Sequence, residues 1–142
     1  MKKYFIILLL FTACSTRHRK AEISFPYDAI EVKASGGFAG TTTGFLIQKN
    51  AEIYVIYHTA GKSYNQKFYR ASTTDSVAQL FQKVYSSGVL TKTYKKPGNL
   101  TYSILSRKDS ITNAVYWSDG QDSIKNYIET YRLIRNFASG RE

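Results

Sequence analysis

The sequence predicts an α+β domain in which an antiparallel sheet carries two helices packed on one face. Tyr, Phe and Trp make up 15% of the 142 residues, and this abundance of rings beside many Thr and Ser favours strands. Six short segments have the pattern of strands, and two others repeat apolar residues at helical spacing. The predicted order is four strands, a helix, two strands and a helix, with short connections that suit this layered arrangement.

The first four strands are predicted before residue 72. In the first, two apolar residues alternate with two charged ones, which is typical of a strand with one buried face. The third is apolar on both faces, which predicts a central strand covered on both sides, or on one side with a surface of aromatic rings on the other. Turn residues separate the segments, so we expect a meander of strands at 28–33, 44–49, 53–58 and 64–72.

From residue 74 the apolar spacing changes to that of a helix. Val77, Leu80, Phe81 and Val84 recur at i, i+3, i+4 and i+7, and Gly88 ends the segment because glycine accepts a left-handed cap. A basic loop follows, then two alternating strands joined by a compact hairpin, and finally a second amphipathic stripe. The predicted segments are a helix at 74–88, a loop at 92–98, strands at 100–105 and 111–117, and a helix at 124–134.

The start of the chain has the layout of a bacterial lipoprotein signal. Lys2 and Lys3 precede a short apolar run, 4–11, which is typical of a secretory signal and too short to span a bilayer as a helix. The sequence Phe-Thr-Ala-Cys at 11–14 then resembles the bacterial lipobox. This resemblance implies cleavage before Cys14, a diacylglyceryl group on its sulfur and an acylated new amino terminus, so that lipid such as palmitate anchors the protein. The alternative is an ordinary cleaved signal or an uncleaved anchor with a leftover cysteine.

These observations divide the chain. Cys14 is the only cysteine, which excludes an intramolecular disulfide and a cysteine-based zinc site. Ser15 replaces the Asp that, by resemblance to enterobacterial lipoproteins, marks retention at the inner membrane, so an outer-membrane address in the cell envelope is favoured. We predict a lipoprotein signal peptide at 1–13, a lipidated tether at 14–27, a single domain at 28–138 and a tail at 139–142.

The formal charge of +10 is unevenly placed. Five cations and no acid lie in the first twenty residues, whereas the remainder carries 15 basic and 10 acidic residues. The basic run before residue 21 is expected to be a solvated tether; the alternative is contact with anionic head groups, worth about 1 kcal/mol per basic residue. The domain shows no stripe of Lys and Arg interleaved with aromatic residues, which argues against a nucleic-acid partner.

Residues suited to catalysis or metal binding are sparse. His18 falls in the tether and His58 at the end of a strand, and neither belongs to a spaced set of ligands. Asp119 and Asp122 are the most plausible pair of carboxylates for acid–base work, but capping and the dipole of the following helix explain them equally well. No nucleophile-elbow, phosphate-loop or zinc-protease motif occurs. We therefore expect neither an enzyme nor a cofactor or metal site.

The densest turn signal is the segment 34–44, which holds four of the nine glycines. Glycine pairs permit positive φ and close approach of other backbone, so a sharp connection is expected there, with Phe38 as its one large apolar residue. The favoured interpretation is a hairpin whose Phe38 tucks under the sheet. The alternative is a presented binding loop with Phe38 as its anchor.

The string Ser-Gly-Gly-Phe-Ala-Gly at 35–40, followed by strands, a helix, more strands and Val-Tyr-Trp-Ser-Asp-Gly at 115–120 before a final helix, resembles emfourin-type proteins. The named member of that family inhibits thermolysin-like metalloproteases. The resemblance covers about residues 28–138 and implies a membrane-anchored, non-enzymatic protein-binding module. The alternative is a structural or envelope-interaction lipoprotein without a protease target. The protease contacts that the resemblance implies are Gly36, Gly37, Phe38 and Ala39.

Overall fold

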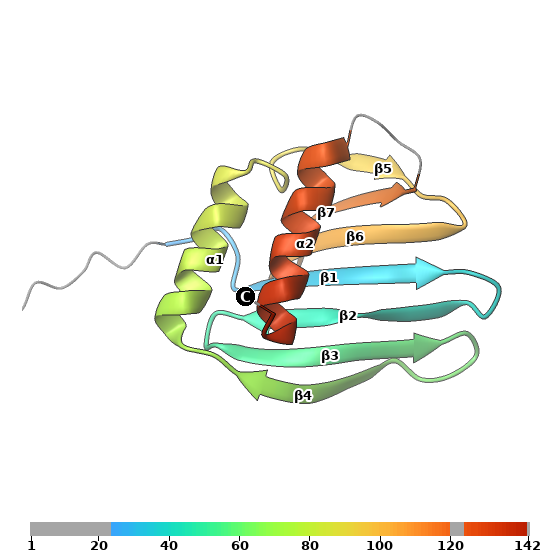
Figure 1. Cartoon of the computed structure of the whole chain (residues 1–142), viewed down its shortest axis with the longest axis horizontal. Helices are drawn as coiled ribbons and strands as arrows, with labels where there is room; N and C mark the ends of the chain where they lie inside the picture. Colours follow the sequence, from blue (N-terminus) through green and yellow to red (C-terminus); the bar gives the residue numbers. More distant parts are fainter. Residues whose placement is uncertain (1–23, 120–123, 142) are drawn as a thin grey trace, which may run out of the picture.

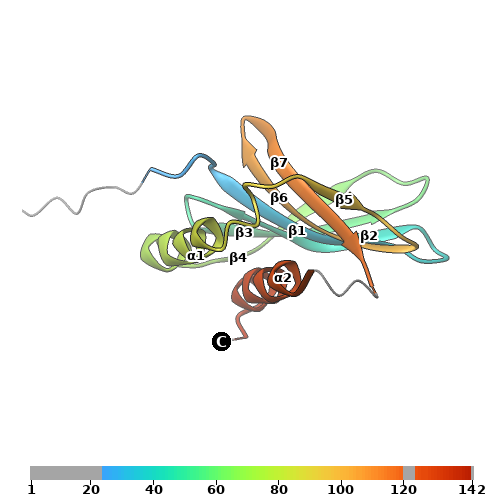
Figure 2. The same ribbon diagram turned by 90° about the horizontal axis from the view of Figure 1, so that it is seen from above.

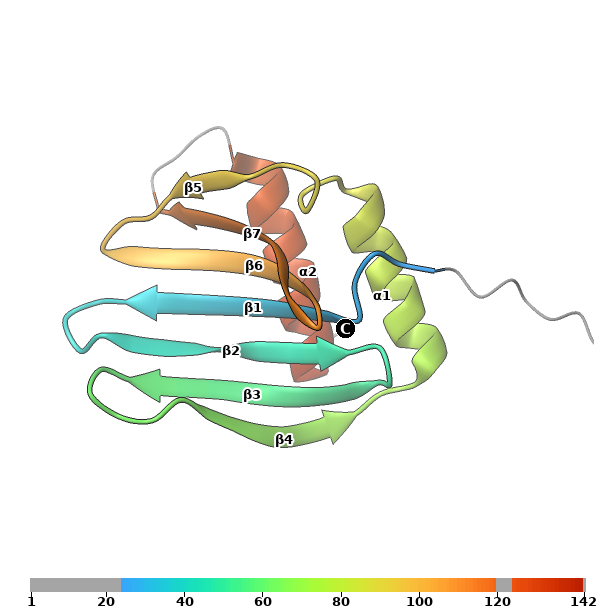
Figure 3. The same ribbon diagram turned by 180° about the vertical axis from the view of Figure 1, so that it is seen from behind.

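The computed structural model of the chain describes residues 24–119 and 124–141. They form one seven-stranded sheet and two helices, which confirms the predicted α+β class (Figure 1). Both helices lie on the same face of the sheet, as Figures 2 and 3 show from above and from behind. In the described part of the chain, no helix covers the opposite face.

The strands follow the spatial order β4-β3-β2-β1-β6-β7-β5. The first strand of the chain therefore lies in the middle of the sheet, where it pairs antiparallel with both β2 and β6. Most strands are two or three residues longer than the alternating patterns indicated. The elements are β1 Ala29–Gly36, β2 Thr41–Gln48, β3 Glu52–Thr59, β4 Asn65–Ala71, α1 Thr74–Ser86, β5 Tyr94–Lys96, β6 Leu100–Lys108, β7 Ser110–Ser118 and α2 Lys125–Ser139.

The prediction of a purely antiparallel sheet with six strands is wrong. Strand β5 lies within the segment expected to be a loop and pairs parallel with β7, so the sheet is mixed and the chain has an extra strand between α1 and β6. Three residues are too few to show an alternating pattern. The Tyr94 ring nevertheless stacks on Tyr127 of α2, with 5.4 Å between ring centroids, which holds this edge of the sheet against the helix.

The hydrophobic core fills the space between the sheet and the two helices. The predicted apolar stripe of α1 is buried there, and Trp117 of β7 packs edge-on against Tyr131 of α2 with 5.7 Å between ring centroids. The helix-free face also buries apolar side chains, because Ile53 and Ile56 of β3 point to opposite faces and both are fully buried. Of the two predictions for β3, the structure therefore fits a strand covered on one side with aromatic rings on the other, where Tyr54 packs against Phe68.

Packing begins within the segment expected to be tether. Phe25 and Tyr27 are buried beside Phe81 of α1, and the Tyr27 hydroxyl donates a 3.0 Å hydrogen bond to the Phe81 carbonyl. The core cluster extends from Phe25 to Ala138. A protein comprising residues 15–142 therefore retains the whole core, and we use it in the experiments below.

Local hydrogen bonds cap both helices, and α2 ends at Ser139, five residues beyond the predicted end at 134. The Thr73 side chain accepts a 3.1 Å hydrogen bond from the Ser76 backbone N–H and so caps the start of α1. At the end of α2, Gly140 adopts the left-handed conformation, and Arg70 of β4 donates a 3.0 Å hydrogen bond to the Ala138 carbonyl. The edge strand β4 is thereby tied to the last turn of α2.

Candidate protein-binding site

The site predicted from the glycine-rich segment is the turn between β1 and β2. The two strands remain paired up to Gly36 and Thr41, so only residues 37–40 form the connection. Gly37 and Gly40 have φ of 73° and 54°, which side-chain-bearing residues rarely adopt, and the Gly40 N–H donates a 3.1 Å hydrogen bond to the Gly37 carbonyl. The glycines thus allow a tight, internally bonded turn.

Neighbouring loops hold this turn on both sides. The Gly37 N–H donates a 2.9 Å hydrogen bond to the Asn99 carbonyl, and the Ala60 N–H donates a 3.1 Å hydrogen bond to the Gly40 carbonyl. Gly36 permits the first contact, because a Cβ at that position would lie 2.1 Å from the Asn99 oxygen. The β1–β2 turn, the β3–β4 turn and the loop before β6 consequently meet at one end of the sheet (Figure 1).

Phe38 projects from this braced turn into solvent. Its exposed fraction is 113% of the reference value, the largest among the exposed large hydrophobic residues. The favoured expectation that Phe38 tucks under the sheet is therefore wrong, and the alternative of a presented loop describes the structure. The reason is that strand pairing stops at Gly36 and Thr41, so no strand continues far enough to cover the ring.

The surroundings of Phe38 combine apolar and basic character. Leu100, the residue that faces Gly36 across the β1–β6 pair, is 38% exposed, and Lys62 of the β3–β4 turn is also exposed. None of the described residues in 37–40, 59–64 and 97–100 is acidic. The three loops therefore present an aromatic anchor beside neutral and basic residues, and Asp119, which follows β7, is an acidic residue at the same end of the sheet. An exposed aromatic anchor suits a partner with an apolar pocket.

Of the residues considered for catalysis in the domain, the structure describes His58 and Asp119. His58 lies partly buried on β3, where its ring centroid is 6.3 Å from that of Tyr64, and Asp119 is exposed at the end of β7. In 24–119 and 124–141, no group of three or more His, Cys, Asp and Glu residues could hold a metal ion. The remaining predicted positions, Cys14, His18 and Asp122, lie outside the described residues.

The sequence pattern missed a buried ion cluster on the helix-free face. Glu31 is 1% exposed, and its Oε2 accepts a 2.7 Å hydrogen bond from Arg107 Nε while Lys33 Nζ lies 2.6 Å from its Oε1. The pKa of the Tyr64 hydroxyl is raised to about 12, mainly by its partial burial and to a smaller extent by the nearby Glu31 carboxylate. The alternation in β1 predicted that Glu31 and Lys33 face solvent. It could not show that Arg107 contacts Glu31, because the two strands that pair here are remote in sequence.

No protein-family model matches this chain, and a comparison with curated proteins finds no similar sequence.

Proposed function

We propose that this chain is a lipid-anchored protein of the bacterial envelope that binds another protein through the β1–β2 turn and restrains a thermolysin-like metalloprotease. The observation that carries the proposal is the full exposure of Phe38 on a turn bonded to loops on both sides. A large ring exposed to water suits an anchor that is desolvated in a partner's pocket. Because its backbone is already held, little conformational entropy is lost when it binds.

The resemblance of 35–40 to the emfourin-type segment supports the choice of partner. In the proposed complex, Phe38 enters a pocket of the protease, and the small residues Gly37 and Ala39 allow the protease surface to approach the backbone closely. Gly36, the remaining candidate contact, faces Asn99 of the chain itself. Lys62, the one charged residue of the three loops, is a candidate contact for a carboxylate at the edge of that pocket.

The position of the turn suits a membrane-tethered inhibitor. The described chain enters the domain beside α1, at the end of the sheet opposite the β1–β2 turn (Figure 1). A strand as long as β1 spans roughly 26 Å, so the turn and the entry point are separated by about the length of the sheet. With a lipid on Cys14, the turn would lie at the end of the domain remote from the point where the tether joins it. In the described residues, no helix is both long and apolar enough to cross a membrane.

The lipid anchor is tested by metabolic labelling. Cells expressing the full chain are grown with labelled palmitate, and the protein is recovered with and without detergent. We expect label in the protein and loss of that label in Cys14→Ala. Equal labelling of the Cys14→Ala variant would overturn the anchor.

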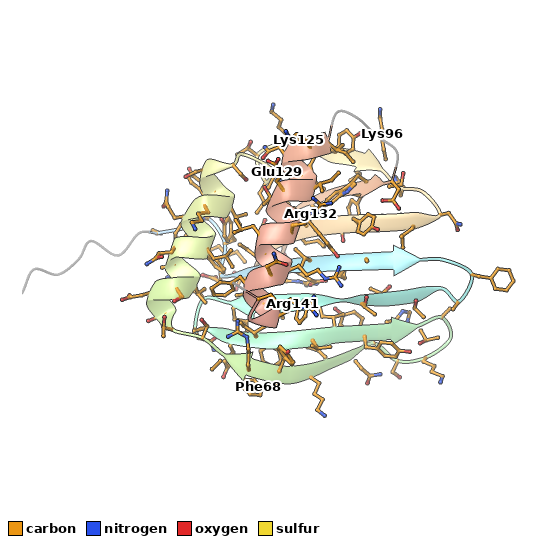
Figure 4. The ribbon with its side chains drawn as sticks, in the orientation of Figure 1. Phe68, Lys96, Lys125, Glu129, Arg132 and Arg141 are labelled. Atoms are coloured by element: carbon orange, nitrogen blue, oxygen red, sulfur yellow. The ribbon has the colours of Figure 1, made fainter. Side chains whose placement is uncertain are left out.

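Inhibition is tested with purified residues 15–142 and a thermolysin-like protease acting on a peptide substrate. We expect micromolar protein to slow cleavage, and Phe38→Ala to weaken inhibition by roughly thirtyfold or more, the loss typical of a central aromatic anchor. Phe68→Ala is the matched control, because Phe68 is 54% exposed but lies on the edge strand β4 (Figure 4).

Two outcomes would contradict the inhibitor. One is no effect on the protease at micromolar protein, and the other is an equal loss of inhibition in Phe38→Ala and Phe68→Ala. If cross-linking in intact cells then recovered envelope components and no protease, the protein would be assigned instead as a structural or envelope-interaction lipoprotein.

A further inference from the structure

A cavity of about 610 Å³ lies between α2 and the sheet, away from the β1–β2 turn. Its walls include the aromatic side chains Phe45, Tyr69, Tyr102 and Trp117, from four different strands. Trp117 is 2% exposed and Tyr69 is 49% exposed, so the cavity passes from the core to the surface. Its volume falls within the range of sites that take small organic ligands.

The cavity continues along the flank of α2. A second hollow of about 230 Å³ shares Phe45, Tyr131 and Arg135 with the first and adds Val55 and Tyr57 of β3 to its lining. The two hollows form one groove, which we call the α2 groove. Its floor is the helix-side face of the sheet, and one wall is α2.

Arginines line the helix wall of the α2 groove. Arg132 and Arg135 are three residues apart on α2 and therefore lie on neighbouring positions of one flank, and Arg141 follows the end of the helix. Figure 4 labels Arg132 on the helix and Arg141 beyond its last turn. All three are exposed, and within the described residues none has a carboxylate within the 4.0 Å of an ion pair.

Glu129 lies three positions before Arg132 on α2, but its ion pair is with Lys125 and not with Arg132. Arginines that stabilise a helix surface are commonly paired with carboxylates three or four positions away, as Lys125 is with Glu129 at 3.9 Å on the same helix. Among the described lining residues, Asp119 is the one acid. The positive charge of Arg132 and Arg135 is therefore available to a bound anion.

We propose that the α2 groove binds a small organic anion, namely a carboxylate, sulfonate or phosphate carried on a planar apolar body. The guanidinium groups of Arg132 and Arg135 pair with the anionic group, since guanidinium presents two parallel N–H donors to such oxygens. The rings of Phe45, Tyr69, Tyr102 and Trp117 pack against the apolar body. This site is separate from the β1–β2 turn and does not depend on protease binding.

The experiment uses two probes that differ in their charge. 8-Anilinonaphthalene-1-sulfonate has a planar body with a sulfonate, and N-phenyl-1-naphthylamine has the same body without it. Trp117 is the only tryptophan in the chain and lines the groove, so energy transfer from Trp117 reports binding near it. With residues 15–142 we expect saturable single-site binding of the sulfonate and at least tenfold weaker binding of the neutral probe.

Substitutions on α2 test where the sulfonate group binds. Arg135→Ala and Arg132→Ala are each expected to weaken sulfonate binding by about tenfold, and Arg135→Lys by less, because a lysine keeps the charge but not the paired donors. Lys125→Ala is the matched control: it removes one cation from the same helix at a side chain that is 87% exposed and outside the groove. Phe38→Ala is expected to leave binding unchanged.

Several results would overturn the site. They are undetectable transfer from Trp117, equal affinity for the charged and neutral probes, equal losses in Arg135→Ala and Lys125→Ala, or loss of binding in Phe38→Ala. Loss of binding in Phe38→Ala would place the probe at the β1–β2 turn and not in the α2 groove. Because no protease is present, failure of this proposal and failure of the proposed inhibitor are distinguished.

Discussion

Glu31 on β1 and Arg107 on β6 form a partly buried ion pair although 76 positions separate them in the chain. The Arg107 Nε donates a 2.7 Å hydrogen bond to Oε2 of a carboxylate that is almost fully buried. Arg107 stands opposite Ala29 in the strand register and reaches diagonally across to Glu31. A slip of one residue between these strands would turn Glu31 into the apolar core, so the pair helps to specify the register at the centre of the sheet.

Removing Arg107 should destabilise the fold. In Arg107→Ala, Glu31 stays buried with Lys33 as its one remaining cationic neighbour, and we expect a loss of about 2 kcal/mol in the free energy of unfolding. Urea denaturation of residues 15–142 measures it. Glu129→Ala, which breaks the exposed pair with Lys125, should cost less than about 0.5 kcal/mol. Equal effects of the two substitutions would contradict the structural role of Glu31 and Arg107.

Gly36 and Gly37 should respond differently to alanine. Gly36→Ala forces a Cβ to within 2.1 Å of the Asn99 oxygen at a φ of 118°, and we expect a loss of more than about 2 kcal/mol. Gly37→Ala meets no atom within 4 Å, so only its left-handed backbone resists the change, at about 1 kcal/mol. Thermal denaturation of both variants measures the two losses of stability. A larger loss in Gly37→Ala than in Gly36→Ala would refute the prediction.

Phe38→Ala should leave stability unchanged. The ring is fully exposed, so its loss should shift the free energy of unfolding by less than about 0.5 kcal/mol. Denaturation of the variant beside the parent chain provides the measurement. Tyr27→Phe serves as a contrast, because it removes a buried hydroxyl bonded to the Phe81 carbonyl and should cost about 1 kcal/mol. A marked destabilisation by Phe38→Ala would mean that the turn packs against the domain.

Stability should fall at high pH. Burial raises the pKa of the Tyr27, Tyr64 and Tyr131 hydroxyls, that of Tyr64 to about 12. In the unfolded chain these hydroxyls lose their protons near pH 10. Their contribution to the free energy of unfolding is therefore fully present below about pH 10 and declines as the pH rises towards 12. Urea midpoints measured across this range should decrease, and less steeply in Tyr64→Phe. A constant midpoint would show that the folded and unfolded chains titrate alike.

The local elements were predictable because their patterns are local. The stripe Val77, Leu80, Phe81 and Val84 identified α1, and short apolar or alternating segments bounded by turn residues identified six of the seven strands. Strand β5 was missed because three residues are too short for a pattern and its parallel partner β7 lies further along the chain. The antiparallel prediction failed for the same reason.

The candidate site could be located but not oriented from sequence. Glycines around Phe38 indicated a turn, yet the direction of its ring depends on where strand pairing stops, which is a property of the assembled sheet. The α2 groove was beyond sequence analysis as well, since Arg135 and Phe45 meet only when the last helix docks on the second strand. Such sites depend on long-range packing that periodicity does not contain.

The central position of β1 has a consequence for how the chain reaches its native state. The protein is synthesised from its amino terminus, so β1 emerges first, but its neighbour β6 begins only at Leu100. Until that strand arrives, one side of β1 presents unpaired N–H and C=O groups beside Ile30 and Val32. Nascent or truncated chains ending before Lys108 should therefore be the species most prone to aggregation and most dependent on chaperones.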